Sequence, residues 1–289
     1  MDGGLLSSRA VGGKNEKLPR KGCILGEIGV YYKEPLKVQN FHNATIERSL
    51  PLMAELTSNE GKNLTIEVDG VTYSRLPLHT HVVTEEDDIC DVAETYATPF
   101  LRPGDTLFIS EKCVACTQQR AIPMKDIKPR RLAVILSHFV TKTPHGIGLG
   151  IPETMEYAIR ECGTLRILFA AFCAAIGKLF GQHGWFYMIA GRKAAAIDGP
   201  CPNTIPPYNE CVVLGPEDPE KASREIAERI GFPVLIVDLN DLGGNILGAS
   251  DAAIDRGLML RVLRDNPLGQ SGEQTPMGII RLAGQAEEG

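Results

Sequence analysis

The chain has 289 residues, of which 43% are hydrophobic and 23% are charged, as in a globular protein of one large domain or two small ones. The formal net charge of -6 argues against a nucleic-acid-binding surface, because such surfaces carry an excess of Lys and Arg. Eight cysteines without an apolar leader before them predict free thiols in a reducing cytoplasm.

Residues 1–20 are rich in Gly, Ser and Lys and predict a flexible tail. Residues 21–75 are expected to form a small β-rich appendage. Within it, Leu64–Val68 and Val71–Tyr73 flank an Asp-Gly turn, which is the pattern of a β-hairpin.

The rest of the chain contains helical and strand-like segments in irregular order. Apolar spacing and helix-start residues predict helices at 85–97, 129–140, 153–162, 219–230 and 250–263. Apolar runs predict strands at 105–110, 185–189, 194–197, 233–237 and 276–281. The segments lack a regular strand–helix–strand rhythm, so we predict an α+β fold.

The most apolar stretch of the chain runs from Ile167 to Gly177 and is flanked by Arg166 and Lys178. A membrane span needs about 20 apolar residues. We therefore predict a buried helix here and no contact with a membrane.

Two aspartates, Asp198 and Asp238, each follow an apolar run that we predict to be a strand. Two ionised carboxylates about 4 Å apart repel by roughly 4 kcal/mol at an effective dielectric near 20, so a meeting of the two favours either a protonated carboxyl or a bound cation. Oxygen ligands of this kind suit Mg²⁺ or Mn²⁺. Asp241 is a third candidate metal ligand. The alternative is that all three residues only occupy turns.

Other patterns carry less chemistry. Cys113 and Cys116 have C-x-x-C spacing, but zinc would need a second pair, so reduced thiols compete with a redox or metal role. His79 and His81 would point to the same side of a strand without a third ligand. The glycine-rich loop at 146–150 lacks the ending of a P-loop, and we interpret it as a flexible connection.

Four blocks of sequence, in order, carry a resemblance to a known family. They are Leu101–Lys112, with a turn and a strand; Ala195–Asn203, with Asp198; Val213–Asp238, with an Asp-Pro helix start; and Leu268–Arg281, a glycine-rich loop and a strand. Together they resemble the coenzyme F-420-0:L-glutamate ligase family, also called γ-glutamyl ligases. The likeness covers residues 76–282 and leaves 283–289 as a tail. It implies a mixed-sheet ligase fold and a homodimer.

The resemblance also implies an activity and a set of site residues. Enzymes of the family use GTP and a divalent cation to attach glutamate through a γ-linked amide, by way of an acyl phosphate. On this sequence the resemblance implies that Asp198 and Asp238 hold the metal and serve catalysis. It further implies a nucleotide site at Lys112, Arg120, Asn203, Gly269 and Gln270. We therefore predict a cytoplasmic, GTP-dependent acid–amino-acid ligase that acts on a small anionic carboxylate or phosphate-bearing substrate and glutamate.

Several positions depart from the family pattern. Cys116 stands in place of a lysine, Gln118 in place of a glutamate, Leu239 in place of a threonine and Gln270 in place of a metal-binding glutamate. Cysteine cannot supply the charge of a lysine beside phosphates, and an amide is a weaker ligand for a hard cation. The alternative prediction is therefore a catalytically inactive homologue that binds a small molecule or metal on the same scaffold.

Overall fold

The computed structural model describes residues 56–140, 147–182, 184–241 and 243–284. The chain divides into two compact units, 1–52 and 53–289, and the described residues all belong to the second. The predicted tail at 1–20 and most of the appendage at 21–75 lie outside the described residues, as do the start of the glycine-rich loop and residues 285–289 of the predicted tail at 283–289.

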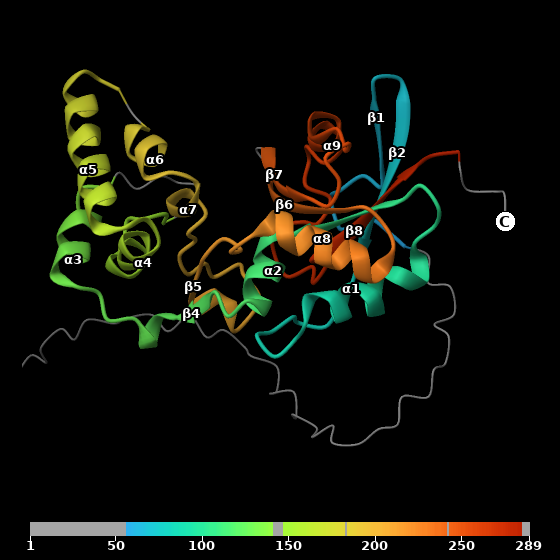
Figure 1. Cartoon of the computed structure of the whole chain (residues 1–289), viewed down its shortest axis with the longest axis horizontal. Helices are drawn as coiled ribbons and strands as arrows, with labels where there is room; N and C mark the ends of the chain where they lie inside the picture. The colour runs from blue at the N-terminus through green and yellow to red at the C-terminus, as the bar shows by residue number, and fades with distance from the viewer. Residues whose placement is uncertain (1–55, 141–146, 183, 242, 285–289) are drawn as a thin grey trace, which may run out of the picture. The chain divides into compact units, whose positions relative to one another are not determined.

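A six-stranded sheet in the order β1-β2-β8-β3-β6-β7 organises the second unit (Figure 1). Its strands are β1 Thr65–Val68, β2 Val71–Leu78, β3 Thr106–Ser110, β6 Val234–Asn240, β7 Gly243–Ala249 and β8 Met277–Leu282. β3 and β6 are parallel, and the other neighbours are antiparallel. The mixed sheet confirms the predicted α+β class. A second sheet pairs β4 Ala121–Pro123 with β5 Cys211–Val213.

The predicted hairpin is confirmed as β1 and β2. Asp69 and Gly70 both have positive φ angles, 53° and 76°, as a tight hairpin turn requires. β2 continues to Leu78 and pairs with β8 along its length. The hairpin is thus part of the main sheet and not of a separate appendage.

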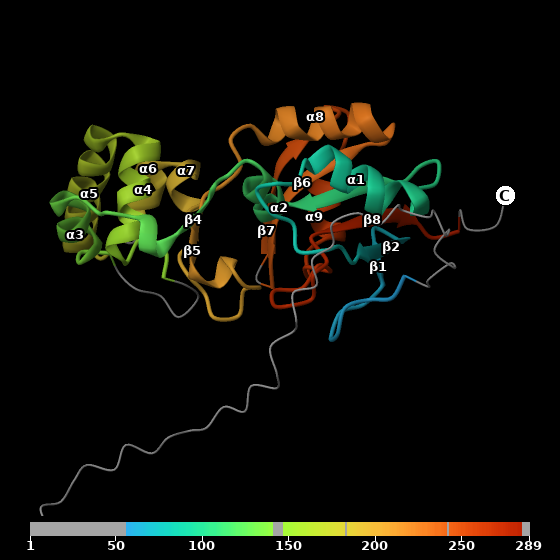
Figure 2. The same cartoon turned by 90° about the horizontal axis from the view of Figure 1, so that it is seen from below.

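Successive side chains of each strand point to opposite faces of the sheet, and each face packs in its own hydrophobic core. Leu107 and Ile109 of β3 pack on one face with α1 Ile89–Ala97 and α8 Pro219–Ile230, which lie on the same side of the sheet (Figure 2). Phe108 points to the other face, where α9 Arg256–Val262 contributes Val262. The same alternation along β6 explains why its apolar run is buried on both sides.

The remaining helices are α2 Glu111–Thr117, α3 Arg131–Ser137, α4 Pro152–Cys162, α5 Thr164–Leu179, α6 Trp185–Ala190 and α7 Arg192–Ala195. Three short 3₁₀ helices are η1 Thr98–Phe100, η2 Met124–Asp126 and η3 Tyr208–Glu210. Helices α3 to α7 share a core of their own, which includes Met155, Ile159 and Ile167, and Figure 1 shows them grouped together. We call these five helices the helical cluster.

Two predicted strands were wrong. Residues 185–189 belong to α6 and residues 194–197 lie at the end of α7 and just beyond it. Each helix is preceded by a glycine with positive φ, Gly184 at 88° and Gly191 at 91°, and a new short helix starts after each of them. A run of four or five apolar residues has no period that separates helix from strand.

The prediction of a buried helix around Ile167 was right in secondary structure and only partly right in burial. Ile167, Ala170 and Gly177 of α5 are buried, whereas Leu165 is 84% and Phe172 is 63% exposed. Among the described residues, no single helix is long and apolar enough to cross a membrane; α4 and α5, bent by 117°, meet the requirements of length and composition only as a pair.

Candidate active site at the carboxyl ends of β3 and β6

Two acidic residues meet where the parallel strands β3 and β6 end. Ser110 pairs with Val237, so Glu111 and Asp238 are the next residues at the same edge of the sheet. Glu111 is also the first residue of α2, where an acidic side chain complements the helix dipole. It is 2% exposed, while Asp238 is half-buried.

Lys112 connects Glu111 to a third carboxylate. Its Nζ donates hydrogen bonds to Oε1 of Glu111 at 2.5 Å and to Oδ2 of Asp198 at 2.8 Å. The backbone of Asp198 is fixed by two hydrogen bonds with Val213 at the end of β5. We call Glu111, Lys112, Asp198 and Asp238 the charge cluster.

Burial and mutual charge set the protonation of the cluster. Burial raises the pKa of Glu111 to about 7, against the opposing effect of Lys112 and with a further rise from Asp238. Burial likewise raises the pKa of Asp238, which Lys112 partly offsets. Burial acts to lower the pKa of Lys112, but the Glu111 and Asp198 carboxylates outweigh it and raise that pKa. The cluster therefore holds a firmly protonated lysine and two carboxyls, those of Glu111 and Asp238, whose raised pKa values disfavour the loss of their protons.

Glu111 has one oxygen without a partner. Its Oε1 accepts from Lys112, while its Oε2 is buried and has no hydrogen-bond donor within reach. Leaving a buried acceptor unsatisfied costs roughly 1–3 kcal/mol, so such a group in a cavity wall marks a position where a donor can be bound.

A cavity of about 330 Å³ opens beside the cluster. Glu111 and Asp238 line it from the sheet, together with Asn245, which pairs with Asp238 across β6 and β7. Its cationic lining residues are Arg120, Arg192 and Lys193. The cavity is thus lined both by cations and by the carboxylates of the sheet edge.

Arg120 is held in place at the cavity wall. Its Nε donates to the carbonyl oxygen of Gly215 at 2.6 Å and its guanidinium donates to Glu161 at 2.6 Å. These bonds orient the guanidinium, and Glu161 also lines the cavity.

The structure brings together some of the residues predicted from sequence and separates others. Lys112, Asp198 and Asp238 lie in the charge cluster, and Arg120 lies in the cavity wall. Asn203 is an exposed turn residue that does not line the cavity.

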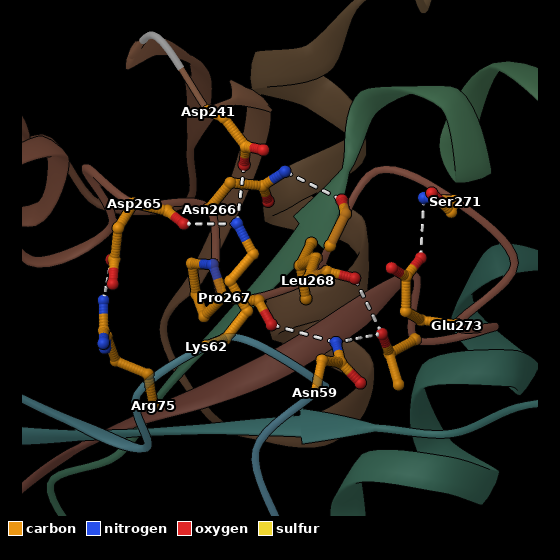
Figure 3. Close-up of polar contacts among 12 residues, drawn as sticks. Asn59, Lys62, Arg75, Asp241, Asp265, Asn266, Pro267, Leu268, Ser271 and Glu273 are labelled. Carbon is orange, nitrogen blue, oxygen red and sulfur yellow. Dashed lines mark hydrogen bonds and ion pairs between the residues drawn. The ribbon is translucent and has the colours of Figure 1, made fainter. Parts of the chain in front are cut away.

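Asp241 belongs to a different polar group, shown in Figure 3. It accepts a hydrogen bond from Lys62 at 2.6 Å, and Lys62 also binds the carbonyl oxygen of Asp265. Across the part of the chain that the structure describes, no three His, Cys, Asp or Glu side chains gather as a metal site would require. The three predicted aspartates are therefore not assembled into one metal site, and only Asp198 and Asp238 share a neighbourhood.

Gly269 and Gln270 lie in the loop that precedes β8. Asn59 braces this loop through the carbonyl oxygen of Pro267 and the hydroxyl of Thr275 (Figure 3). Glu273 bends back to accept the backbone N–H of Ser271 at 2.7 Å. Its carboxylate is engaged within the loop, and Gln270 is exposed.

Sequence reasoning missed Glu111, Arg192 and Lys193. The signal for Glu111 was present, because it follows a predicted strand directly, as Asp238 does. Arg192 and Lys193 lie between the two segments that were wrongly predicted to be strands, and the wrong secondary structure concealed their position in the cavity wall.

The C-x-x-C pair is internal to α2. Cys113 and Cys116 are both free and buried, and burial raises the pKa of Cys116 to about 11, although a hydrogen bond with Tyr208 acts the other way. Buried protonated thiols are poor nucleophiles and poor metal ligands. Gln118 has a structural bond as well, since its Oε1 accepts the backbone N–H of Glu217 at 2.8 Å.

The fold and the site define a mixed α+β protein with a charged cavity at the carboxyl end of its parallel strand pair. A family model described as F420-0:Gamma-glutamyl ligase matches residues 77–238, which is more than half of the chain. The chain belongs to the F420-0:gamma-glutamyl ligase family, as its sequence blocks indicated. The matched region contains β3, the helical cluster and the whole charge cluster, and it ends at Asp238. None of the curated proteins compared matches the chain.

Proposed function

We propose that this protein is a nucleotide- and metal-dependent acid–amino-acid ligase that forms a γ-glutamyl amide. The observation that carries the proposal is the charge cluster at the carboxyl ends of β3 and β6, beside a cavity lined by Arg120, Arg192 and Lys193. Ligands of α/β proteins commonly bind at this edge of a sheet.

The proposed reaction has two steps. The substrate carboxylate attacks the γ-phosphorus of a nucleoside triphosphate, which forms an acyl phosphate and releases the nucleoside diphosphate. The amino group of glutamate then attacks the acyl carbon, inorganic phosphate leaves and the nitrogen gives up its proton to complete the amide. Neither step needs a protein nucleophile, so the protein contributes chiefly position and charge.

Asp198 and Asp238 would hold a divalent cation. Mg²⁺ is commonly bound by one or two protein carboxylates together with phosphate oxygens, so this pair suffices as a donor set. The cation would neutralise phosphate charge. Lys112, which already binds Asp198, would keep that carboxylate oriented.

Cations from other positions compensate for the lysine that the family carries at position 116. Cys116 is buried and uncharged, but Lys112 and the α7 residues Arg192 and Lys193 bring positive charge to the same region. Arg120 would contact phosphate from the cavity wall. The unpartnered Oε2 of Glu111 would accept a hydrogen bond from the incoming amino group.

A second candidate function is binding without turnover. It is favoured by the structural use of altered positions: Gln118 binds the backbone of Glu217, and Cys116 packs in the core. Gln270 lies in a loop that is braced by its own contacts. On this reading the cavity would take a small anion and leave it unchanged.

Thermal unfolding with GTP, ATP or GDP, each with and without Mg²⁺ or Mn²⁺, tests both candidates. A ligand that binds only the folded state stabilises it by about 2.7 kcal/mol at a hundred times its dissociation constant. We expect a metal-dependent shift that Asp238→Asn abolishes. Glu94→Gln, an exposed carboxylate of α1 paired with Arg229, is the matched control and should keep the shift.

Product formation then separates the ligase from the binding protein. Mass spectrometry of mixtures that contain glutamate, a nucleotide, the metal and candidate carboxylic acids should show an amide product that depends on all four. Binding without any product would support the second candidate. Folded protein that binds no nucleotide at millimolar concentration, with metal present, would exclude the ligase.

A further inference from the structure

The helical cluster exposes apolar side chains on a scale found nowhere else in the described chain. Among the residues that the structure describes, every large hydrophobic side chain that is more than half exposed lies in α3, α5, α6 or the residue or two that follow them. We call this set the apolar face: Ile135, Phe139, Leu165, Phe169, Phe172, Leu179, Phe180 and Met188.

The apolar face follows from the spacing of α5. Leu165, Phe169 and Phe172 are three or four residues apart, so they lie along one side of the helix. The opposite side carries the buried Ile167 and Ala170. A helix on the surface of a water-soluble domain normally turns polar residues outward, whereas α5 is apolar on both sides.

Contacts within the cluster bring the other apolar residues alongside α5. Nζ of Lys178 donates to the carbonyl oxygen of Phe139 at 3.0 Å, which ties the end of α3 to the end of α5. Trp185 of α6 packs closely over Gly177. The exposed apolar residues thus belong to three helices that contact one another through these bonds and packing contacts.

The helices that carry the apolar face contain cations and no carboxylates. Helices α3 and α5 contain Arg and Lys but no Asp or Glu, and α6 has no charged residue, although the whole chain has a net charge of -6 and the neighbouring α4 carries three glutamates. The cations of α3 and α5 are Arg131, Arg166 and Lys178. An apolar stripe flanked by cations is the pattern of helices that lie in the interface of an anionic membrane.

We propose that the apolar face docks onto the surface of an anionic lipid bilayer, with α5 lying in the plane of the interface. Leu and Phe side chains would enter the acyl boundary, and Lys178 and Arg131 would meet the headgroup phosphates. A second copy of this chain is a poorer occupant, because a symmetric contact through α3 and α5 would bring the cations of these helices together, and neither helix supplies a carboxylate to pair with them. The inference replaces the expectation from sequence that the chain makes no membrane contact.

Vesicle flotation of the full chain tests the proposal. Vesicles of phosphatidylcholine alone are compared with vesicles that also contain phosphatidylglycerol, and binding is followed by co-flotation and by fluorescence. Trp185 is the only tryptophan of the chain and belongs to the cluster, so its emission reports directly on the face. We expect binding to the anionic vesicles, with a blue shift of Trp185 emission, and at least about tenfold weaker binding to phosphatidylcholine alone.

Two double variants locate the binding surface. Phe169→Ser with Phe172→Ser should weaken binding by about tenfold or more, because two exposed apolar side chains are lost. Val71→Ser with Leu282→Ser removes two apolar side chains of the sheet that are 38% and 37% exposed, and it should leave binding unchanged. Unfolding temperatures of both variants confirm that each protein is folded.

Three results would overturn the proposal. The first is a folded wild-type chain that floats with neither kind of vesicle. The second is equal binding by the Phe169→Ser, Phe172→Ser variant. The third is a wild-type dimer in solution that this variant converts to monomers and that anionic vesicles do not dissociate, since the face would then be covered by a second copy.

Discussion

Glu111 combines three properties that rarely occur together in one side chain. It is buried, one of its oxygens has no partner, and it lines a cavity that contains cations. Desolvation disfavours its charged form, and Asp238 and Asp198 add to that effect. A carboxyl in such a place is expected to influence stability as well as ligand binding.

The pH dependence of stability should reveal Glu111. Its pKa is raised from 4.5 to about 7 on folding, so the folded state binds the proton more tightly, and the stabilisation is full below pH 4.5 and lost as the pH rises through about 7. Over that window the free energy of unfolding should fall by up to about 3 kcal/mol. Urea unfolding across the window should show a shallower fall for Glu111→Gln than for the wild type. Parallel curves for the two proteins would contradict the assignment.

Cysteine reactivity gives a second test at the scale of single residues. Thiolates react with alkylating reagents, and burial holds Cys116 protonated by raising its pKa to about 11. We expect iodoacetamide at neutral pH to modify the exposed Cys201 in the folded protein and Cys116 only after denaturation, as followed by mass spectrometry of peptides. Labelling of both at similar rates would restore the redox or metal interpretation of the C-x-x-C pair.

The sequence indicated half of the site. Asp198 and Asp238 were recognisable because each follows an apolar run, and the structure places both beside Lys112. Glu111 lies beside Asp238 because of the register between β3 and β6. These strands are far apart in the chain, and no local sequence pattern predicts their register. Asp241 follows the same apolar run as Asp238, yet its carboxylate forms an ion pair with Lys62.

At the scale of elements, an ion pair joins the start of β3 to β8. Asp105 is 1% exposed and accepts two hydrogen bonds from Arg281, at 2.9 and 2.6 Å, and a third from the backbone N–H of Arg102. Arg281 also binds the carbonyl oxygen of Phe100. The pair fixes the turn before β3 against the strand beside it.

Removing one partner of this buried pair should be costly. Asp105→Ala leaves the Arg281 guanidinium without its carboxylate, and we expect a loss of about 3–5 kcal/mol in the free energy of unfolding, measured by chemical denaturation. Glu225→Ala breaks the exposed pair with Lys221 in α8 and should cost less than about 0.5 kcal/mol. Similar losses in the two variants would show that the Asp105 pair contributes no more than a surface contact.

Elements with strong local signals were predictable, and short apolar ones were not. The helix that starts at Asp218 was found because its side chain caps the backbone N–H of Lys221 and proline follows it. The helix predicted at 250–263 starts later, because Asp255 provides its cap. The exposure of α5 could not be predicted from the sequence, because an apolar helix has the same sequence pattern whether it is buried in the protein or exposed on its surface.

At the scale of the whole molecule, charge is unevenly distributed. The net charge of the chain is negative, while the charged side chains of the exposed helices α3 and α5 are all cations. Such separation gives a directional attraction to anionic surfaces without a general affinity for polyanions.

Salt should therefore weaken docking without abolishing it. The Debye length falls from about 10 Å at 0.1 M salt to about 3 Å at 1 M, which screens the cations and leaves the apolar contribution in place. Flotation with anionic vesicles at increasing salt should show reduced binding that reaches a plateau. Complete loss at high salt would mean that the apolar side chains contribute nothing, and no change would mean the same of the cations.

The junction between α6 and α7 connects the apolar face with the cavity, so binding at one can affect binding at the other. Arg166 of α5 donates to the carbonyl oxygen of Ile189 and lies directly against Gly191, and the next two residues, Arg192 and Lys193, line the cavity. A bilayer bound at α5 and an anion bound at α7 would therefore both contact residues that adjoin Gly191. Thermodynamic reciprocity then requires that any factor by which the bilayer changes affinity for the anion is the factor by which the anion changes affinity for the bilayer.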